Sequence, residues 1–348
     1  MSISYFLGSN SKDGFFSLYD NFCRGSGDYL SIIKGGPGTG KSSFMKNIAA
    51  EAEKRGLEAE YVLCSGEPGS LDGFYIPALH RGWLDGTAPH SMDVRRFGID
   101  SDYVNLGQFC DTPLPSESVD YVNHVYDSYG EEYSKAYACL SAAGKAEKNC
   151  SQPELDSTNH EKLRKRISGI IARSSKGKTL KGGRRDVFLR ALCSRGDIRL
   201  DAEVNKLCKL IYQFDSALGL AEQALGIVRE EAQKCGARLI VCHQPLIPEK
   251  YEAVILPELG IGFTDGTFAA DNSRNIRVDA LIPRETVQRC TPEFRDRAEN
   301  VKKLEESAIL HLKKANEIHD VIEKLYLERM DFEALNEFSR KYIEKIFK

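Results

Sequence analysis

The sequence predicts an α/β protein made of two copies of one unit in tandem, each with a parallel sheet flanked by helices and followed by a helical extension. Three observations predict this fold. An apolar run, a glycine-rich turn and an amphipathic pattern follow one another at residues 30–56, as in strand, loop and helix. Much of this pattern recurs 180 residues later, and apolar stripes at helical spacing follow each half. We expect two domains, 1–180 and 181–348.

The composition is that of an ordinary soluble protein. The 348 residues carry a net charge of −3, which gives no general attraction to nucleic acid or to anionic membranes. No stretch approaches the roughly 18 apolar residues of a membrane span, and the N-terminus lacks the pattern of a signal peptide. The ten cysteines form no CxxC pair and no zinc-type group with histidine. We therefore expect a cytoplasmic protein with reduced thiols and no membrane association.

The segment from Gly35 to Ser42 matches the pattern GxxxxGK[ST], the phosphate-binding loop (P-loop) of nucleoside triphosphatases. Its glycines let successive backbone N–H groups curl around a phosphate at the N-terminus of the next helix. Lys41 is expected to reach the β- and γ-phosphates, and the Ser42 hydroxyl to bind Mg²⁺. The residues expected to bind ATP are Gly35, Gly36, Pro37, Gly38, Thr39, Gly40, Lys41, Ser42 and Ser43. A dinucleotide-binding turn is excluded, because Lys41 stands where its third glycine would be.

Acidic residues after the next two strands are candidates for the chemistry. A strand at 61–64 precedes a polar loop with Glu67 and Asp72, which should emerge beside the P-loop. Asp85 ends a weaker strand, where P-loop proteins keep the carboxylate that holds Mg²⁺; a plain Asp-Gly turn is the alternative. Many ATPases carry a water-orienting glutamate at the next position, which is Gly86 here. We therefore expect Glu67 or Asp72 to be the catalytic carboxylate, with a solvated loop as the alternative.

Three pairs of stretches show the repeat. They are IPALHRGWLDGTA (76–88) with LPELGIGFTDGTF (256–268), AAEAEKRG (49–56) with REEAQKCG (229–236), and FLGSNSKDG (6–14) with FLRALCSRG (188–196). Their common order indicates a duplicated unit. The same alignment places Leu220 and Ala221 where the first copy has Gly40 and Lys41. The second copy is therefore expected to lack a phosphate site, with Asp265 kept as a turn residue.

Four stretches carry a resemblance to a known family: KGGPGTGKSS, SLDGFYIPALHRGWLDGTAPHSMD, VNLGQF and HDVIEKLYLERMDF. They are similar to bacterial duplicated P-loop ATPases, most of which have no assigned reaction, and the likeness covers nearly the whole chain. The resemblance implies ATP binding by residues 35–43. It also implies importance for Cys64, Ser70, Leu71, Asp72, Asp85, Gly86, Thr87, Pro89 and His90. Members of this family carry a P-loop in both halves, so the altered second copy departs from their pattern.

Helices and one basic stretch account for the rest of the chain. Apolar residues recur every three or four positions at 119–140, 163–170 and 304–325, which predicts helices that pack within the chain. The stretch from Lys162 to Arg185 carries ten basic residues and no acidic one. We interpret it as a solvated linker; a contact with phosphate or nucleic acid and a protein-docking patch are the alternatives.

The leading hypothesis is a Mg²⁺-dependent ATPase whose first half binds and slowly hydrolyses ATP, while the second half is structural or regulatory. A small-molecule or nucleotide kinase is the alternative, because Glu67 or Asp72 could deprotonate an acceptor hydroxyl. A third hypothesis is a nucleotide-gated module that binds a protein or RNA partner through the helices and the basic segment 162–185.

Overall fold

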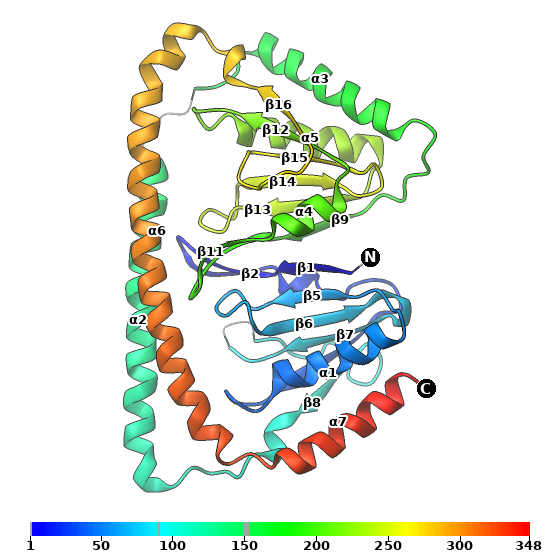
Figure 1. Cartoon of the computed structure of the whole chain (residues 1–348), viewed down its shortest axis with the longest axis vertical. Coiled ribbons are helices and arrows are strands. Elements are labelled where there is room, and N and C mark those ends of the chain that lie inside the picture. Colours follow the sequence, from blue (N-terminus) through cyan, green and yellow to red (C-terminus); the bar gives the residue numbers. More distant parts are fainter. Residues whose placement is uncertain (1, 89–90, 149–152) are drawn as a thin grey trace.

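The computed structural model describes residues 2–88, 91–148 and 153–348, and it shows two α/β units beside a pair of long helices (Figure 1). The first unit contains β1 (Ile3–Phe6), β2 (Gly8–Ser11), β3 (Gly14–Ser17), β4 (Tyr29–Lys34), α1 (Lys41–Lys54), β5 (Glu60–Leu63), β6 (Leu71–Ile76), β7 (Arg81–Asp85) and β8 (Ser101–Asn105). The second contains β9 (Arg184–Val187), β10 (Arg190–Cys193), β11 (Gly196–Arg199), α4 (Asp201–Leu207), β12 (Leu210–Asp215), α5 (Ala221–Cys235), β13 (Leu239–His243), β14 (Tyr251–Leu256), β15 (Ile261–Thr264) and β16 (Ser273–Arg277). The remaining helices are α2 (Ser116–Lys148), α3 (Ser157–Ser175), α6 (Arg284–Leu327) and α7 (Phe332–Ile346).

The two units share one strand order. The first sheet reads β1-β5-β6-β7-β4-β8 and the second β9-β13-β14-β15-β12-β16, which is the same order when the strands are matched along the chain. The predicted duplication is therefore confirmed. Both sheets are mixed, because β6 and β14 run antiparallel to their neighbours while the other neighbours are parallel.

The predicted parallel sheet is confirmed in part: most neighbouring strands are parallel, and β6 is the exception in the first unit. Asp72 was expected in a polar loop, but it is the second residue of a strand that begins at Leu71. Leu71, Phe74 and Ile76 are buried in the core, whereas Asp72 and Gly73 between them interrupt the apolar run. A strand carrying a buried carboxylate and a glycine has little of the usual strand signal.

The long helices α2 and α6 lie antiparallel along one side of both units (Figure 1). The apolar stripes predicted both of them, and buried Leu140, Ala308 and Leu312 show that these stripes face the interior. A polar contact supplements this packing, with His311 Nδ1 2.7 Å from Glu132 Oε2. No helix in the described ranges is long and apolar enough to cross a bilayer.

The two halves exchange their outer helices. Helix α3, which follows the first unit, packs on α5 of the second; its Leu163, Ile167 and Ile170 join the core of that unit. Helix α7, which ends the chain, packs on α1 of the first unit and brings Leu335 and Phe338 to its core. Figure 1 shows the two helices at opposite ends of the molecule. Each α/β unit is therefore completed by a helix from the other half.

The basic segment 162–185 is not a linker over most of its length. Residues 162–175 belong to α3 and 184–185 begin β9. Arg164 bonds Glu231 at 2.6 Å and Glu230 at 2.8 Å on α5, which replaces solvation by specific ion pairs. The linker interpretation failed because these arginines and lysines occupy the polar face of an amphipathic helix.

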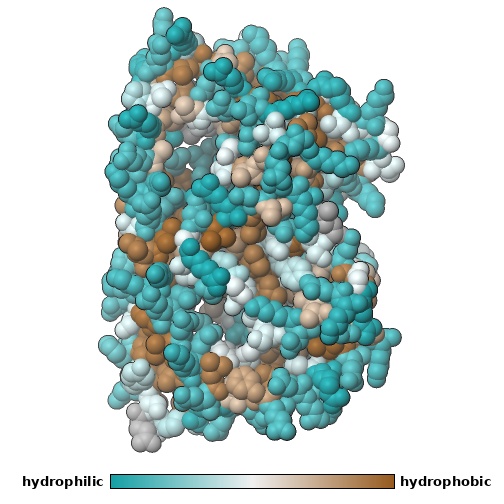
Figure 2. Space-filling model, in the orientation of Figure 1, coloured by the Kyte–Doolittle hydropathy of each residue, from teal (hydrophilic) through white to brown (hydrophobic). Residues whose placement is uncertain are grey.

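The units meet edge to edge at β1 and β9. Phe6 and Phe188 exchange two backbone hydrogen bonds of 2.9 Å, and both side chains are fully buried in a core shared by the units. Hydrophobic residues gather near the middle of the face in Figure 2, at the level of this junction, while hydrophilic residues cover most of the rest.

Each unit also extends a hairpin to the other. The turn of the β2–β3 hairpin reaches the second unit, where Lys12 N donates to Leu246 O at 3.0 Å. The turn of the β10–β11 hairpin reaches the first unit, where Ser194 N donates to Gly66 O at 3.2 Å. The two contacts are equivalent under the internal duplication, so they form a matched pair.

Candidate functional site

The candidate site lies at the edge of the first sheet that faces α6. Strands β4, β5 and β7 end at this edge, and the antiparallel strand β6 begins there. The carboxyl ends of parallel strands are the usual place for ligand sites in α/β proteins. Because of the antiparallel strand, Asp72 at the start of β6 and Asp85 at the end of β7 come to the same edge.

The glycine turn, residues 35–40, connects β4 to α1. Gly38 has φ of +70° and Gly40 has φ of +82°, a left-handed conformation that side chains other than glycine rarely adopt. Helix α1 begins at Lys41 without a side-chain cap. Within the described ranges, the backbone N–H groups from Gly38 to Ser43 donate no hydrogen bond to a backbone carbonyl. The turn therefore presents a row of free donors at the positive end of a helix.

Lys41 is folded back over this turn. Its Nζ donates to Gly36 O at 2.8 Å and to Gly35 O at 3.1 Å, and it lies 3.7 Å from Asp85 Oδ2. Lys41 and Asp85 are each about one-tenth exposed, 12% and 13% of the side chain. The ammonium group is thus held beside the free N–H groups and next to a carboxylate.

Ser42 lies one residue into α1 and contacts the start of β6. Its Oγ accepts a hydrogen bond of 2.9 Å from Leu71 N. A hydroxyl oxygen has a second lone pair and a proton, so this bond leaves Ser42 able to bind a further partner. The bond also ties the first turn of α1 to β6, the strand on which Asp72 lies.

Asp85 closes a short turn after β7. Its Oδ1 accepts from Thr87 N at 2.9 Å and from Thr87 Oγ1 at 2.6 Å, which leaves Oδ2 toward Lys41. Gly86 has no room for a side chain, since a Cβ there would lie 2.3 Å from Ile32 Cγ2. A glutamate cannot follow Asp85 in this backbone, so any carboxylate that takes a proton must come from another element.

Asp72 is buried at this edge and bonded to a tyrosine that sequence reasoning missed. Tyr19 Oη donates to Asp72 Oδ2 at 2.7 Å, and both residues are less than 5% exposed. Burial and the Asp72 carboxylate raise the pKa of the Tyr19 hydroxyl well above its ordinary value. They raise the pKa of the neighbouring Cys64 thiol in the same way. Tyr19 and Cys64 are therefore protonated at neutral pH, and Tyr19 acts as a donor to Asp72.

Glu67 lies on the segment 64–70 and points to the second unit. Its carboxylate forms an ion pair with Arg195 and accepts from Ser194 Oγ at 3.0 Å, both on the β10–β11 turn. It also accepts from Gly69 N at 3.2 Å. The structure thus brings Lys41, Ser42, Asp72 and Asp85 together, whereas Glu67 is held by the hairpin.

The C-terminal end of α6 lies over the glycine turn. A Cβ on Gly38 would lie 2.7 Å from Glu323 O, and one on Gly36 would lie 3.8 Å from the Tyr326 ring. Gly38 is thus needed for the close approach of this helix as well as for its φ angle, whereas a Cβ on Gly36 would make an ordinary contact with the ring. Sequence reasoning missed Tyr326, because nothing in a local pattern shows that a helix 290 residues away in the chain crosses the turn.

One group of side chains in the described ranges has the make-up of a metal site. His319, Asp320 and Glu323 each offer a ligand atom within 4.8 Å of the others, on one turn of α6. Asp320 is exposed, and exposed acidic groups of this kind are common on helices without a metal. We assign no role to this group.

The second unit fills the equivalent turn with its own atoms. Ser216 Oγ accepts from Leu220 N at 2.9 Å and from Leu218 N at 3.2 Å, and the Asp279 carboxylate accepts from Ala217 N at 2.7 Å. Leu218 and Leu220 are fully buried. Leu218, Leu220 and Glu222, whose equivalents in the first unit are Gly38, Gly40 and Ser42, thus have acceptors within the second unit, the last of them Gly219 O at 3.4 Å.

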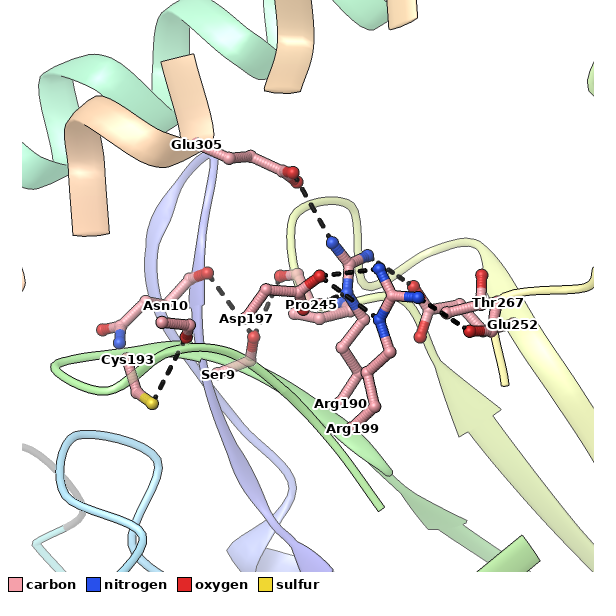
Figure 3. A network of polar contacts seen from close by, with 11 residues as sticks. Ser9, Asn10, Arg190, Cys193, Asp197, Arg199, Pro245, Glu252, Thr267 and Glu305 are labelled. Atoms are coloured by element: carbon pink, nitrogen blue, oxygen red, sulfur yellow. Dashed lines mark hydrogen bonds and ion pairs between the residues drawn. The ribbon is translucent and has the colours of Figure 1, made fainter. Parts of the chain in front are cut away.

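The acidic pair of the second unit lies beside an arginine of the same unit. Glu252 and Asp265 occupy the positions equivalent to Asp72 and Asp85. Arg190 Nη1 donates to Glu252 Oε1 at 2.8 Å and its Nε to Asp197 Oδ1 at 2.6 Å. Figure 3 shows Arg190 and Arg199 side by side at this network, with Glu305 reaching it from α6. An arginine of the second unit therefore contacts Glu252, the residue equivalent to Asp72.

Glu252 gives this network a pH dependence. Burial and the Asp265 carboxylate raise the pKa of Glu252 to about 8, and its Oε2 has no hydrogen-bond partner in the described ranges. The folded protein therefore holds a proton here that the unfolded chain releases near pH 4.5. As the pH rises from about 5 to 9, we expect the free energy of unfolding to fall by roughly 2 to 4 kcal/mol.

Urea unfolding of the wild type and of Glu252→Gln at several pH values tests this expectation. The amide cannot ionise, so the free energy of unfolding of the variant should fall much less than that of the wild type as the pH rises. A residual slope is expected from Asp265 and Glu305, because burial raises the pKa of both carboxyls. Equal slopes for the two proteins would show that Glu252 is ionised in the folded state at neutral pH.

Comparisons with known proteins add no assignment. No protein-family model, no curated protein and no solved structure matches this chain. The resemblance to duplicated P-loop ATPases therefore stays a prediction, and Pro89 and His90, which it singled out, lie outside the described residues.

Proposed function

We propose that the first unit binds ATP with Mg²⁺ at the glycine turn and hydrolyses it, with one nucleotide per chain. The observation that carries this proposal is the row of free N–H groups from Gly38 to Ser43 beside the Lys41 ammonium. Donors of this kind at a helix N-terminus, together with a lysine, suit a polyphosphate and few other ligands. The self-capped turn of the second unit supports a single site.

Each residue of the site has a separate role under this proposal. Lys41 would exchange the carbonyls of Gly35 and Gly36 for phosphate oxygens, which are stronger acceptors because they are charged. Ser42 and Asp85 would hold Mg²⁺, which neutralises charge on the phosphates. Asp72, bonded to Tyr19, would be the nearest buried carboxylate able to orient the attacking water.

Calorimetric titration tests the proposal. The wild type should bind one Mg-ATP per chain, and Asp85→Asn should bind ATP in EDTA as the wild type does while losing the gain that Mg²⁺ brings. Thr87→Val is the matched control, because it removes a hydrogen bond to Asp85 without removing the carboxylate. Two equivalent sites, or no binding, would contradict the proposal.

A kinase is the second candidate, and the packing at Gly86 favours it. No glutamate can follow Asp85, so the usual water-orienting group of ATPases is missing, while Asp72 could instead accept a proton from an acceptor hydroxyl. Incubation with γ-labelled ATP and a pool of small metabolites distinguishes the two reactions. A kinase transfers the label to an organic acceptor; an ATPase releases it only as phosphate.

A further inference from the structure

The β10–β11 hairpin of the second unit is rigidly held at its base. Arg190, at the start of β10, is only 9% exposed and bonds Asp197 on β11 as well as Glu252 on β14. Arg190 Nη2 also lies 3.5 Å from Glu305 Oε2, so α6 is tied to the same base (Figure 3). Buried charges with several partners fix a side chain in one arrangement.

The tip of this hairpin enters the first unit. Ser194 Oγ donates to Gly66 O at 2.8 Å and to Glu67 Oε2 at 3.0 Å, and Arg195 pairs with the same Glu67 carboxylate. The Arg195 side chain is 58% exposed, although the preceding residue, Ser194, is hydrogen-bonded to Gly66. The guanidinium is therefore positioned by a rigid hairpin but remains free to change partners.

The segment that receives the hairpin also contacts the first turns of α1. Lys46 Nζ donates to Gly69 O at 2.7 Å, and Leu71 N donates to Ser42 Oγ at 2.9 Å. Residues 66–71 thus lie between the β10–β11 turn on one side and the residues after the glycine turn on the other. This is the side of the site on which Asp72 and Asp85 lie, where the terminal phosphate would be transferred.

We propose that Arg195 is a catalytic arginine that the second unit supplies to the phosphate site of the first. The inference rests on the proposed function. When a nucleotide is bound, the guanidinium exchanges the Glu67 carboxylate for oxygens of the terminal phosphate, since both are charged acceptors that suit its planar donors. It forms no covalent bond; it stabilises the charge that develops on the phosphate oxygens during transfer.

This role gives the second unit a function that its own turn has lost. The hairpin is equivalent to the β2–β3 hairpin, where Asp13 stands at the position of Arg195. The β2–β3 turn meets a unit whose glycine turn is self-capped, and it offers Lys12 and Asp13 rather than an arginine. Of the two hairpin turns, the one that carries an arginine is therefore the one that contacts the unit with the free N–H groups.

Arg195→Ala tests the inference, with turnover and nucleotide affinity measured separately. We expect kcat to fall by at least about a hundredfold while the Kd for Mg-ADP changes by less than about threefold, because the arginine acts on the transition state. Binding of ADP with aluminium fluoride, which imitates the transferring phosphate, should weaken in parallel with kcat. Arg195→Lys should recover only a small part of either loss.

Lys12→Ala is the matched control on the other hairpin. It removes the contact of Lys12 with Glu249, 3.2 Å apart, and so weakens an equivalent junction between the units. Under the inference it leaves kcat near the wild-type value. If Lys12→Ala and Arg195→Ala lower kcat equally, the hairpins only hold the units together and the inference is overturned.

Glu67→Gln separates the arginine from its present partner. If the ion pair is purely structural, Glu67→Gln and Arg195→Ala should lower kcat equally. If Arg195 is catalytic, Glu67→Gln should lower kcat much less than Arg195→Ala does. Wild-type kcat in Arg195→Ala with loss of activity in Lys41→Ala overturns this inference but keeps the proposed function. Wild-type activity in both variants overturns both.

Discussion

Lys41→Ala is expected to lower kcat/KM for Mg-ATP by about 10³-fold or more, because the variant loses an ammonium group that lies beside both the glycine turn and Asp85. The lysine is the only charged group expected to contact the β- and γ-phosphates directly from the turn. Steady-state phosphate release, with calorimetry of Mg-ATP binding, measures the effect. Binding should weaken together with turnover, since the contact exists before and during the reaction.

Lys46→Ala is the matched control for this loss. Lys46 lies on the same helix five residues later, and its Nζ bonds Gly69 O rather than the turn. It should change kcat/KM far less than Lys41→Ala does. A similar small effect in both variants would mean that the turn binds its ligand without the lysine, which a P-loop does not do.

Trp83→Ala should lower the free energy of unfolding by about 3 to 5 kcal/mol, the usual cost of truncating a buried tryptophan. Trp83, on β7, is fully buried, and its ring stacks on Phe74 with centroids 5.9 Å apart. Its Nε1 donates to Tyr342 Oη at 3.1 Å, so the variant also loosens α7 from the sheet. Urea unfolding followed by circular dichroism measures the change. Tryptophan fluorescence cannot be used, because Trp83 is the single tryptophan of the chain and the variant lacks it.

Tyr342→Phe separates the hydrogen bond from the packing at this place. It keeps the ring but leaves the buried Trp83 N–H without its acceptor, at a cost of about 1 to 3 kcal/mol. The loss should be smaller than that of Trp83→Ala. A larger loss would show that α7 is held mainly by its polar contacts, Tyr342 with Trp83 and with Ser31 Oγ at 3.1 Å.

The features that the sequence predicted are those written in local patterns. The apolar run before Gly35 became β4, and the helical spacing after Gly40 became α1. The place of Asp85 at the end of a strand was also predicted, although the pattern of this strand is weak, and β7 does end at Asp85. The duplication was found from three short stretches, and the shared strand order confirms it.

The features that the sequence did not predict depend on contacts distant along the chain. Asp72 looked like a loop residue, because a carboxylate in a strand is stable only when a partner such as Tyr19 is buried with it. Glu67 looked like a free acid, since its partner Arg195 lies in the other half. The exchange of α3 and α7 could not be predicted from local sequence. An amphipathic stripe shows that one face of a helix is buried, but it does not show which element covers that face.

The exchange of the outer helices within one chain fixes the ratio of the two units at one to one. Two separate identical subunits that swapped helices would have to carry the same residues at both turns, so losing the lysine from one would remove it from both. Covalent fusion removes that restriction. One copy can keep Lys41 while the other devotes its equivalent position, Ala221, to packing, and neither copy can leave to pair with a different partner.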